Sequence, residues 1–353
     1  MEADPAWINS MIKPAAQPGV AGRVQAPKAS VTMQEISPIQ ISLDKLNLPR
    51  AVKGRAGTSS NLEAAMGISV ARMQMLASDG QTLRVGATNL NINSDAVGGS
   101  STAVNFKVNV AEVTLGERDK AVGINITGVV NDLVDASGGI NPSNATVSVR
   151  GDLPQIPTVL LDALSANDGT VVDALGPVAK AKFNIERYPL SGKPREGTTP
   201  PVIDVDAGSQ RANAKVKGSI RSDGIFVSQE PFRANVLEVT QALSSRFIKG
   251  LPLMGTFVKT PQDQPATLEI TNITASLQND LSKLNADIVF DPGEARFGTS
   301  SAFGELLKVV EARTAGQVGK KLEPVTMKVR NGVATYDRWR VPLGEFTVET
   351  EGT

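Results

Sequence analysis

The chain has 353 residues, with 36 basic and 36 acidic side chains, and it contains neither histidine nor cysteine. Zero net charge removes the attraction that supplies most non-specific affinity for nucleic acid. The missing residue types are the commonest general base, the thiol nucleophile and the main zinc ligands. We therefore expect a non-enzymatic protein without a metal, a cofactor or a nucleic-acid partner.

The chain divides by composition into a lead-in, two β-rich parts and a loop between them. Prolines and glycines among small residues predict an extended or partly disordered lead-in over residues 1–35. A β-rich domain with one strand-helix-strand module is expected over residues 36–190, and a Gly- and Pro-rich linker loop over 191–201. Residues 202–353 are expected to form a second β-rich module.

Short runs of alternating apolar and polar residues, such as Val104 to Val110, predict strands in which every second side chain shares one sheet face. Clusters of Gly, Asn, Asp and Ser between the runs predict tight reversals and an antiparallel meander. The apolar phase slips by one residue between Val110 and Val113, which predicts a β-bulge. Strands are expected at Ile39–Leu43, Gly67–Met73, Thr82–Val85, Leu90–Asn93, Val104–Leu115, Val122–Val130, Ala145–Arg150, Phe183–Ile185, Val202–Val205, Ala214–Ile220, Thr267–Leu277, Leu284–Phe290, Val325–Val329, Val333–Tyr336 and Glu345–Thr350.

Apolar residues at helical spacing predict three amphipathic helices, over Ile156–Ala166, Asn235–Lys249 and Ser301–Arg313. The first two share a weak internal repeat, because Val159–Ser165 resembles Val236–Ser244. The pattern indicates a reused module of strand, helix and strand.

The expected fold is mainly β with a few short helices, an elongated and curved antiparallel sheet with an apolar concave face. Aromatic residues make up only 4% of the chain, and three short helices would cover only part of that face as lids. The alternative is that helices and sheet together make an ordinary filled core.

The local motifs do not indicate a metal-binding or catalytic site. Asp204 and Asp206 resemble the start of a calcium loop, but the later ligands are missing. Asp287 and Asp291 flank an apolar run, and alternation places both on the outer face of a strand. The chain has no apolar run long enough to span a membrane and stops within an expected strand, so we expect a segment of a longer protein whose anchor lies elsewhere.

The C-terminal third resembles the end domain of the AsmA-like bacterial envelope proteins, the family of TamB and related bridge-like lipid carriers. The resemblance lies in the expected helix at residues 303–310, the strand at 325–333 with Asn331 and Gly332 near its end, and then Tyr336 and the strand at 341–346. Strand and helix units at residues 153–185 and 231–270 extend it weakly over two thirds of the chain.

This resemblance implies an aliphatic sheet face that holds phospholipid acyl chains in the periplasm or cell envelope, with possible envelope-protein partners and membrane association through regions outside this segment. Absence of cysteine is compatible with such an oxidising compartment. The alternative is a structural or adhesive β-protein that binds a protein partner through its sheet. The candidate groove residues are the inward positions of the alternating strands: Val104, Phe106, Val108, Ile124, Ile126, Ile270, Ile288, Phe290, Met327 and Val329.

Overall fold

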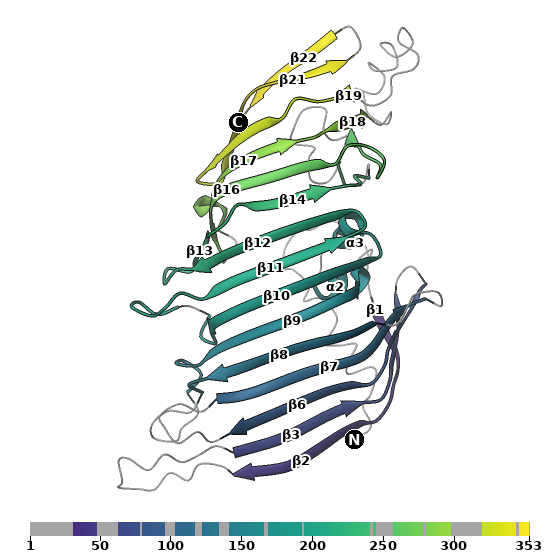
Figure 1. The fold of residues 1–353 in the computed structure, drawn as a ribbon, viewed down its shortest axis with the longest axis vertical. Helices are drawn as coiled ribbons and strands as arrows, with labels where there is room; N and C mark the ends of the chain where they lie inside the picture. The colour runs from purple at the N-terminus through teal and green to yellow at the C-terminus, as the bar shows by residue number, and fades with distance from the viewer. Residues whose placement is uncertain are drawn as a thin grey trace, which may run out of the picture. The chain divides into compact units, whose positions relative to one another are not determined.

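The computed structural model describes residues 31–47, 63–77, 80–95, 103–116, 122–133, 141–165, 169–192, 194–240, 243–244, 257–277, 280–297, 320–343 and 346–352. These residues are mainly in antiparallel strands, as the sequence predicts (Figure 1). The chain forms two compact units. Unit 1 comprises residues 1–171 and 177–205, and unit 2 comprises residues 172–176 and 206–353.

The described part of unit 1 is built around one large antiparallel sheet with one short helix, α2. Strands β2, β3, β6, β7, β8, β9 and β10 pair in that spatial order. The bounds of its elements are β1 Val31–Ile36, β2 Ile39–Asn47, β3 Glu63–Val70, β4 Met73–Ala77, β5 Thr82–Val85, β6 Thr88–Asp95, β7 Ala103–Leu115, β8 Val122–Asn131, β9 Thr146–Pro157, α2 Thr158–Ser165 and β10 Val178–Pro189.

One end of this sheet is bent, and the bend explains why several strands come in pairs along the chain. The short strands β1, β4 and β5 are each joined to a long strand, β2, β3 and β6 respectively, by a two-residue break. The breaks are at Ser37–Pro38, Ala71–Arg72 and Gly86–Ala87. Strand β7 is continuous through the bend, but its pairing with β8 shifts register between Val110 and Val113, which confirms the predicted bulge. The expected single strand Gly67–Met73 is therefore wrong, because the bend divides it between β3 and β4.

The buried core of unit 1 lies at this bend, where α2 packs against β1 and β9. Its apolar side chains come from four bent strands, the end of β9 and the helix. They are Val31, Met33, Met75, Ala77, Leu83, Val85, Val113, Ile156, Val159 and Ala163, each less than 9% exposed. Val31 and Met33 belong to the stretch predicted as a lead-in, and strand β1 adds them to this core.

Unit 2 contains a second antiparallel run, in which β12, β14, β16, β17, β20, β21 and β22 pair in order and β13 pairs with β12 and β16. A small separate sheet joins β15, β18 and β19. The bounds are β12 Ala212–Ile220, β13 Ile225–Ser228, β14 Phe232–Val236, β15 Phe257–Val258, β16 Ala266–Ser276, the 3-10 turn η2 Leu281–Lys283, β17 Asn285–Asp291, β18 Glu294–Phe297, β19 Lys320–Lys321, β20 Val325–Arg330, β21 Val333–Leu343 and β22 Phe346–Gly352. Strand β11, Val202–Ser209, and helix α3, Thr170–Leu175, each contain the point where the chain passes from one unit to the other.

The three predicted helices compare differently with the structure. The first is confirmed as α2, although Ile156 and Pro157 belong to β9. The second is wrong over its first residues, since Asn235 and Val236 lie in β14, where Val236 pairs with Ala266. The third, Ser301–Arg313, lies outside the described residues.

A distant backbone partner explains why the helix does not begin at Asn235. Val239 forms a bridge with Lys259, and each backbone N–H donates to the carbonyl of the other at 3.0 Å. The following Thr240 accepts a hydrogen bond at Oγ1 from the N–H of Leu243 at 3.2 Å, as an N-cap does. The described helical residues, Leu243 and Ser244, therefore follow this cap.

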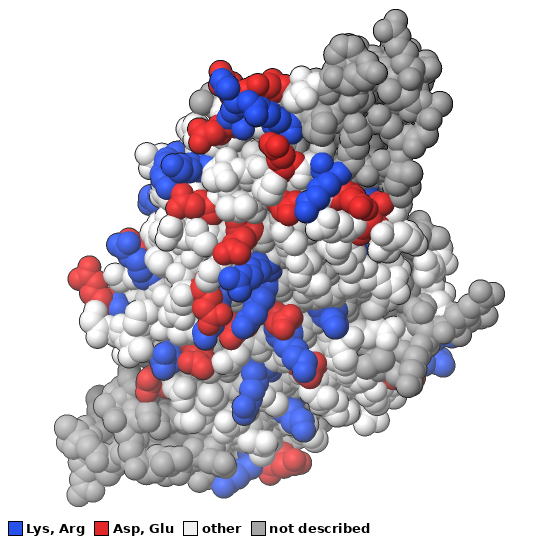
Figure 2. Space-filling model, turned by 45° about the horizontal axis from the view of Figure 1, so that its top comes forward, with Lys and Arg blue, Asp and Glu red and all other residues white. Residues whose placement is uncertain are grey.

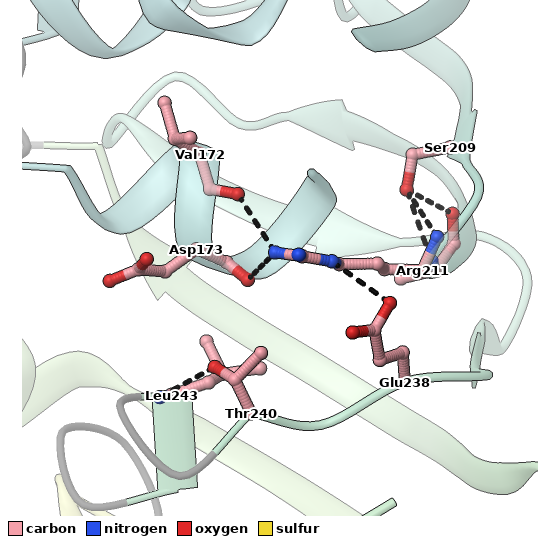
Figure 3. A network of polar contacts seen from close by, with 8 residues as sticks. Val172, Asp173, Ser209, Arg211, Glu238, Thr240 and Leu243 are labelled. Carbon is pink, nitrogen blue, oxygen red and sulfur yellow. Dashed lines mark hydrogen bonds and ion pairs between the residues drawn. The ribbon is translucent and has the colours of Figure 1, made fainter. Parts of the chain in front are cut away.

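Arg211 binds the end of α3 within unit 2 (Figure 3). Its Nη1 donates to the carbonyls of Val172 at 3.3 Å and Asp173 at 2.9 Å, and its Nε lies 3.0 Å from Oε2 of Glu238. The Val172 carbonyl also accepts the N–H of Gly176 at 2.8 Å. The last carbonyls of a helix lack partners within the helix, so the guanidinium supplies a donor to Asp173 near the end of α3. We assign this network a structural role, stabilising the end of α3.

Candidate functional site

The five candidate groove residues of unit 1 lie on the same side of its sheet. In antiparallel pairing, residues directly opposite one another project to the same side. Phe106 lies opposite Gly128, Val108 opposite Ile126, and Val110 opposite Ile124. Val104 follows on the same side two residues before Phe106. We call this the aliphatic side of unit 1.

The aliphatic side continues across seven strands, because the register shifts keep apolar residues opposite one another. The shift after Leu43 in β2, for example, lets Leu46 project to the same side as Leu43. One row from β2 to β10 consists of Ile41, Ile68, Leu90, Val108, Ile126, Gly151 and Phe183, and the next consists of Leu43, Met66, Ile92, Phe106, Gly128, Val149 and Ile185.

Burial differs sharply between the bend and the rest of the aliphatic side. At the bend, Leu83 of β5 is fully buried and Val159 of α2 is 6% exposed. Away from the bend, Val108 and Ile126 are only half-buried. On β2, Ile41 and Leu43 are each 57% exposed. The apolar side chains of the long strands are therefore less completely covered than those of the core.

Two phenylalanine rings cover glycines on this side. A β-carbon on Gly128 would lie 2.2 Å from Cζ of Phe106, and one on Gly151 would lie 2.4 Å from Cε1 of Phe183. Each ring therefore occupies the place of the missing side chain on the neighbouring strand, which keeps the row continuous.

The five candidates of unit 2 also share one side of their sheet. Ile270 lies opposite Ile288, which lies opposite Met327, and Phe290 is in the adjacent row opposite Leu268. Val329 lies opposite Ala286. Val329 is 6% exposed and the other four are half-buried. The structure thus brings the candidates together in two groups, one in each unit.

The opposite sides of both sheets carry charges of mixed sign. Cross-strand ion pairs include Lys182 with Asp152 at 3.4 Å and Arg233 with Glu269 at 3.4 Å. Arg330 pairs with Asp287. In the face shown in Figure 2, acidic and basic side chains are interleaved over the described residues. Such pairing favours neither a nucleic-acid backbone nor a strongly anionic surface.

Asp287, which the sequence raised as a possible acid or base, is held by neighbours on this charged side. Asn272 Nδ2 donates to its Oδ2 at 2.7 Å, and this hydrogen bond, followed by the contact with Arg330, lowers the pKa of Asp287. The carboxylate is therefore stabilised in its charged form. This environment supports a structural role.

The polar side of unit 1 contains a hollow of about 620 Å³ that the sequence did not identify. Its floor is formed by two rows of polar residues on β6 to β10. One row is Asn91, Lys107, Thr127, Arg150 and Asn184, and the other contains Asn93, Asn105, Val129 and Ser148, with Glu186 and Arg187 at the same edge. The sequence feature that could have indicated this hollow is the recurrence of asparagine at alternate positions, as at Asn89, Asn91 and Asn93.

Among the described residues of unit 2, the side chain of Lys259 is a buried cation, only 1% exposed. Its Nζ donates to the carbonyls of Gln264 and Glu294, both at 2.5 Å. Burial lowers the pKa of Lys259, and the nearby carboxylates of Asp263, Glu294 and Asp291 partly oppose that shift. Because the amine is sealed among backbone acceptors, it holds loops together and is not presented to a substrate.

Within the described residues, no group of acidic side chains is arranged to hold a metal ion. None of the helices in that part of the chain has the length and apolar character needed to cross a membrane. Comparisons with protein-family models, with curated proteins and with solved structures find no match. The resemblance to AsmA-like proteins therefore stays a prediction from the sequence.

Proposed function

We propose that the chain is a non-catalytic lipid-handling segment that holds acyl chains on the aliphatic side of its sheet. The observation that carries the proposal is the row from Ile41 to Phe183, in which apolar residues or ring-covered glycines face one another across seven strands. At about 4.8 Å between strands, such a row is about 29 Å long. That length is sufficient for an extended acyl chain.

The uneven burial of the aliphatic side supports this proposal. Water contact with aliphatic side chains is unfavourable by about 25 cal/mol per Å². Ile41, Leu43 and Leu46 are each more than half exposed on β2. An acyl chain that covered them would itself leave water, with about 0.8 kcal/mol gained for each buried CH₂ group. No general base or nucleophile is needed for this transfer.

In the proposal, helix α2 serves as a partial lid, and its packing against β1 and β9 supports this role. The helix closes the bent end of the sheet, and the long strands carry the lipid. The concave curvature of the apolar face, the elongated form and the second group of candidates around Ile288 are parts of the same proposal. So are an envelope or periplasmic location, an AsmA-like relationship and a membrane anchor outside this segment.

The test is native mass spectrometry of the purified chain, with organic extraction of any bound lipid. Ile41→Asp should remove lipid, because it places a charge on the aliphatic side. Gln40→Asp is the matched control, since Gln40 is exposed and projects to the opposite side of the same strand. Both variants must retain the circular dichroism spectrum of the parent protein.

Retained phospholipid that is lost in Ile41→Asp and kept in Gln40→Asp would support lipid handling. A lipid-free chain that also fails to take up phospholipid from vesicles would contradict it. The alternative, a structural or adhesive protein that binds a partner through its sheet, would then be favoured, since the exposed aliphatic residues of β2 would still require an occupant.

A further inference from the structure

We propose that the polar hollow of unit 1 binds an acidic saccharide, a hydroxyl-rich ring that carries a carboxylate or a phosphate. The hollow has a volume of about 620 Å³, within the range of pockets for small ligands. Its polar side chains project to the side of the sheet opposite to the aliphatic rows, and Phe106, Gly128 and Val149 of one such row also border it.

The neutral surroundings of Lys107 are the first reason for an anionic ligand. Lys107 lies opposite Asn91 on one neighbouring strand and Thr127 on the other. Its neighbours on β7, Asn105 and Asn109, are neutral as well. Elsewhere on these polar sides, cations such as Arg233 face a carboxylate on the adjacent strand. Lys107 thus differs in having only neutral side chains around it.

Arg150 provides a second cation in the same row. Its Nε donates to Oγ1 of Thr127 at 3.3 Å, and Asn184 is opposite it on β10. Two strand spacings separate Arg150 from Lys107, about 10 Å between backbones. Long side chains of this kind can converge on one anionic group between them.

The rim of the hollow adds another cation and the hollow's single carboxylate. Arg187 has a left-handed backbone, with φ of 54°, at the register shift between Ile185 and Tyr188. Its N–H donates to Oγ of Ser148 at 3.0 Å. Glu186 accepts from Asn184 at 3.0 Å and lies 3.9 Å from Arg187. Three cations and one carboxylate leave a local charge of +2 in the lining.

The neutral lining is the reason for a saccharide. Asn91, Asn93 and Asn105 present side-chain amides, and Thr127 and Ser148 present hydroxyls. Amides and hydroxyls both donate and accept hydrogen bonds, so they match the hydroxyl groups of a sugar ring. Val129 supplies a half-buried apolar patch among them, suited to the C–H face of a ring.

The test is isothermal titration calorimetry of the full chain with three probes: tetragalacturonate, glucose 6-phosphate and neutral maltotetraose. We expect at least one acidic probe to bind about tenfold more tightly than maltotetraose. Its affinity should fall between 50 and 500 mM salt, because surface attraction is screened. A preference for tetragalacturonate would assign the anion as a carboxylate, and a preference for glucose 6-phosphate would assign a phosphate.

Two variants and a control locate the site. Lys107→Gln and Arg150→Gln should each weaken binding of the acidic probe by about fivefold or more. Lys180→Gln removes the same charge from an exposed position on β10 outside the hollow and should leave affinity within about twofold. Absence of binding by both acidic probes at 10 mM, equal binding of maltotetraose, or unchanged affinity in both hollow variants would overturn the proposal.

Discussion

The ring of Phe106 occupies the space that a side chain on Gly128 would need, since a β-carbon there would lie 2.2 Å from Cζ of the ring. The two residues are directly opposite on β7 and β8. A glycine inside a strand normally weakens the sheet, because it contributes no side chain to packing. Here the neighbouring aromatic ring takes over that packing.

We predict that Gly128→Ala destabilises the chain by about 1–3 kcal/mol, because the added methyl group must displace the ring of Phe106. Urea unfolding measures the change. Combining it with Phe106→Leu should recover part of the loss, since the smaller side chain leaves room for the methyl group. A double variant whose losses simply add would show that the two residues do not interact.

Arg211→Gln should destabilise unit 2 by about 1–3 kcal/mol, because the carbonyls of Val172 and Asp173 and the carboxylate of Glu238 lose a shared donor. Arg211→Lys should restore little of this, since an ammonium group lacks the planar fork of a guanidinium. Amide hydrogen exchange should become faster in residues 172–176.

The matched control for this network is Arg233→Gln. Arg233 and Glu269 form an exposed cross-strand pair, with side chains 69% and 45% exposed. Exposed pairs typically contribute less than about 1 kcal/mol. Equal losses of unfolding free energy in Arg211→Gln and Arg233→Gln would contradict a special role for Arg211.

Asp287 should titrate below its ordinary pKa of 3.8, because Asn272 donates to its carboxylate and Arg330 is adjacent. Its folded pKa is lower than its unfolded pKa, so its contribution to stability is present above pH 3.8 and is lost as the pH falls through the folded pKa. Carboxyl-carbon NMR titration measures this value. Asn272→Ala should move it upward toward 3.8, and an unchanged value would exclude the hydrogen bond as its main cause.

Lys259 should make stability rise with pH on the alkaline side. Burial lowers its folded pKa below 10.5, so between the two pKa values the unfolded chain binds more protons than the folded chain. The unfolding free energy of the parent, minus that of Lys259→Met, should therefore increase as the pH rises toward 10.5. Urea titrations at several pH values measure this difference, and a flat or falling difference would contradict the lowered pKa.

Strand positions were largely predictable, because alternation is a local property of the chain. The expected strand at Thr82–Val85 matches β5, and Val104–Leu115 differs from β7 by one residue. The slip between Val110 and Val113 was also visible in the sequence and is observed as a bulge. The grouping of Val104, Phe106 and Val108 on one side follows from alternation alone.

Other features depended on partners far away in the chain. The helix expected from Asn235 fails because Ala266 and Lys259 provide strand partners for Val236 and Val239. The bend that separates β3 from β4 depends on breaks in two other strand lines and on the register shift in β7, so it cannot be predicted from the sequence of one strand.

The sequence by itself determined which side chains share a face, because a strand's side chains alternate whatever its neighbours are. Only the tertiary structure decided what stands opposite each of them. It placed the Phe106 ring over Gly128, and it surrounded Lys107 with neutral neighbours while it gave Arg233 a carboxylate. The physical reason is that register is fixed by backbone pairing between distant strands and by the bulges that shift it.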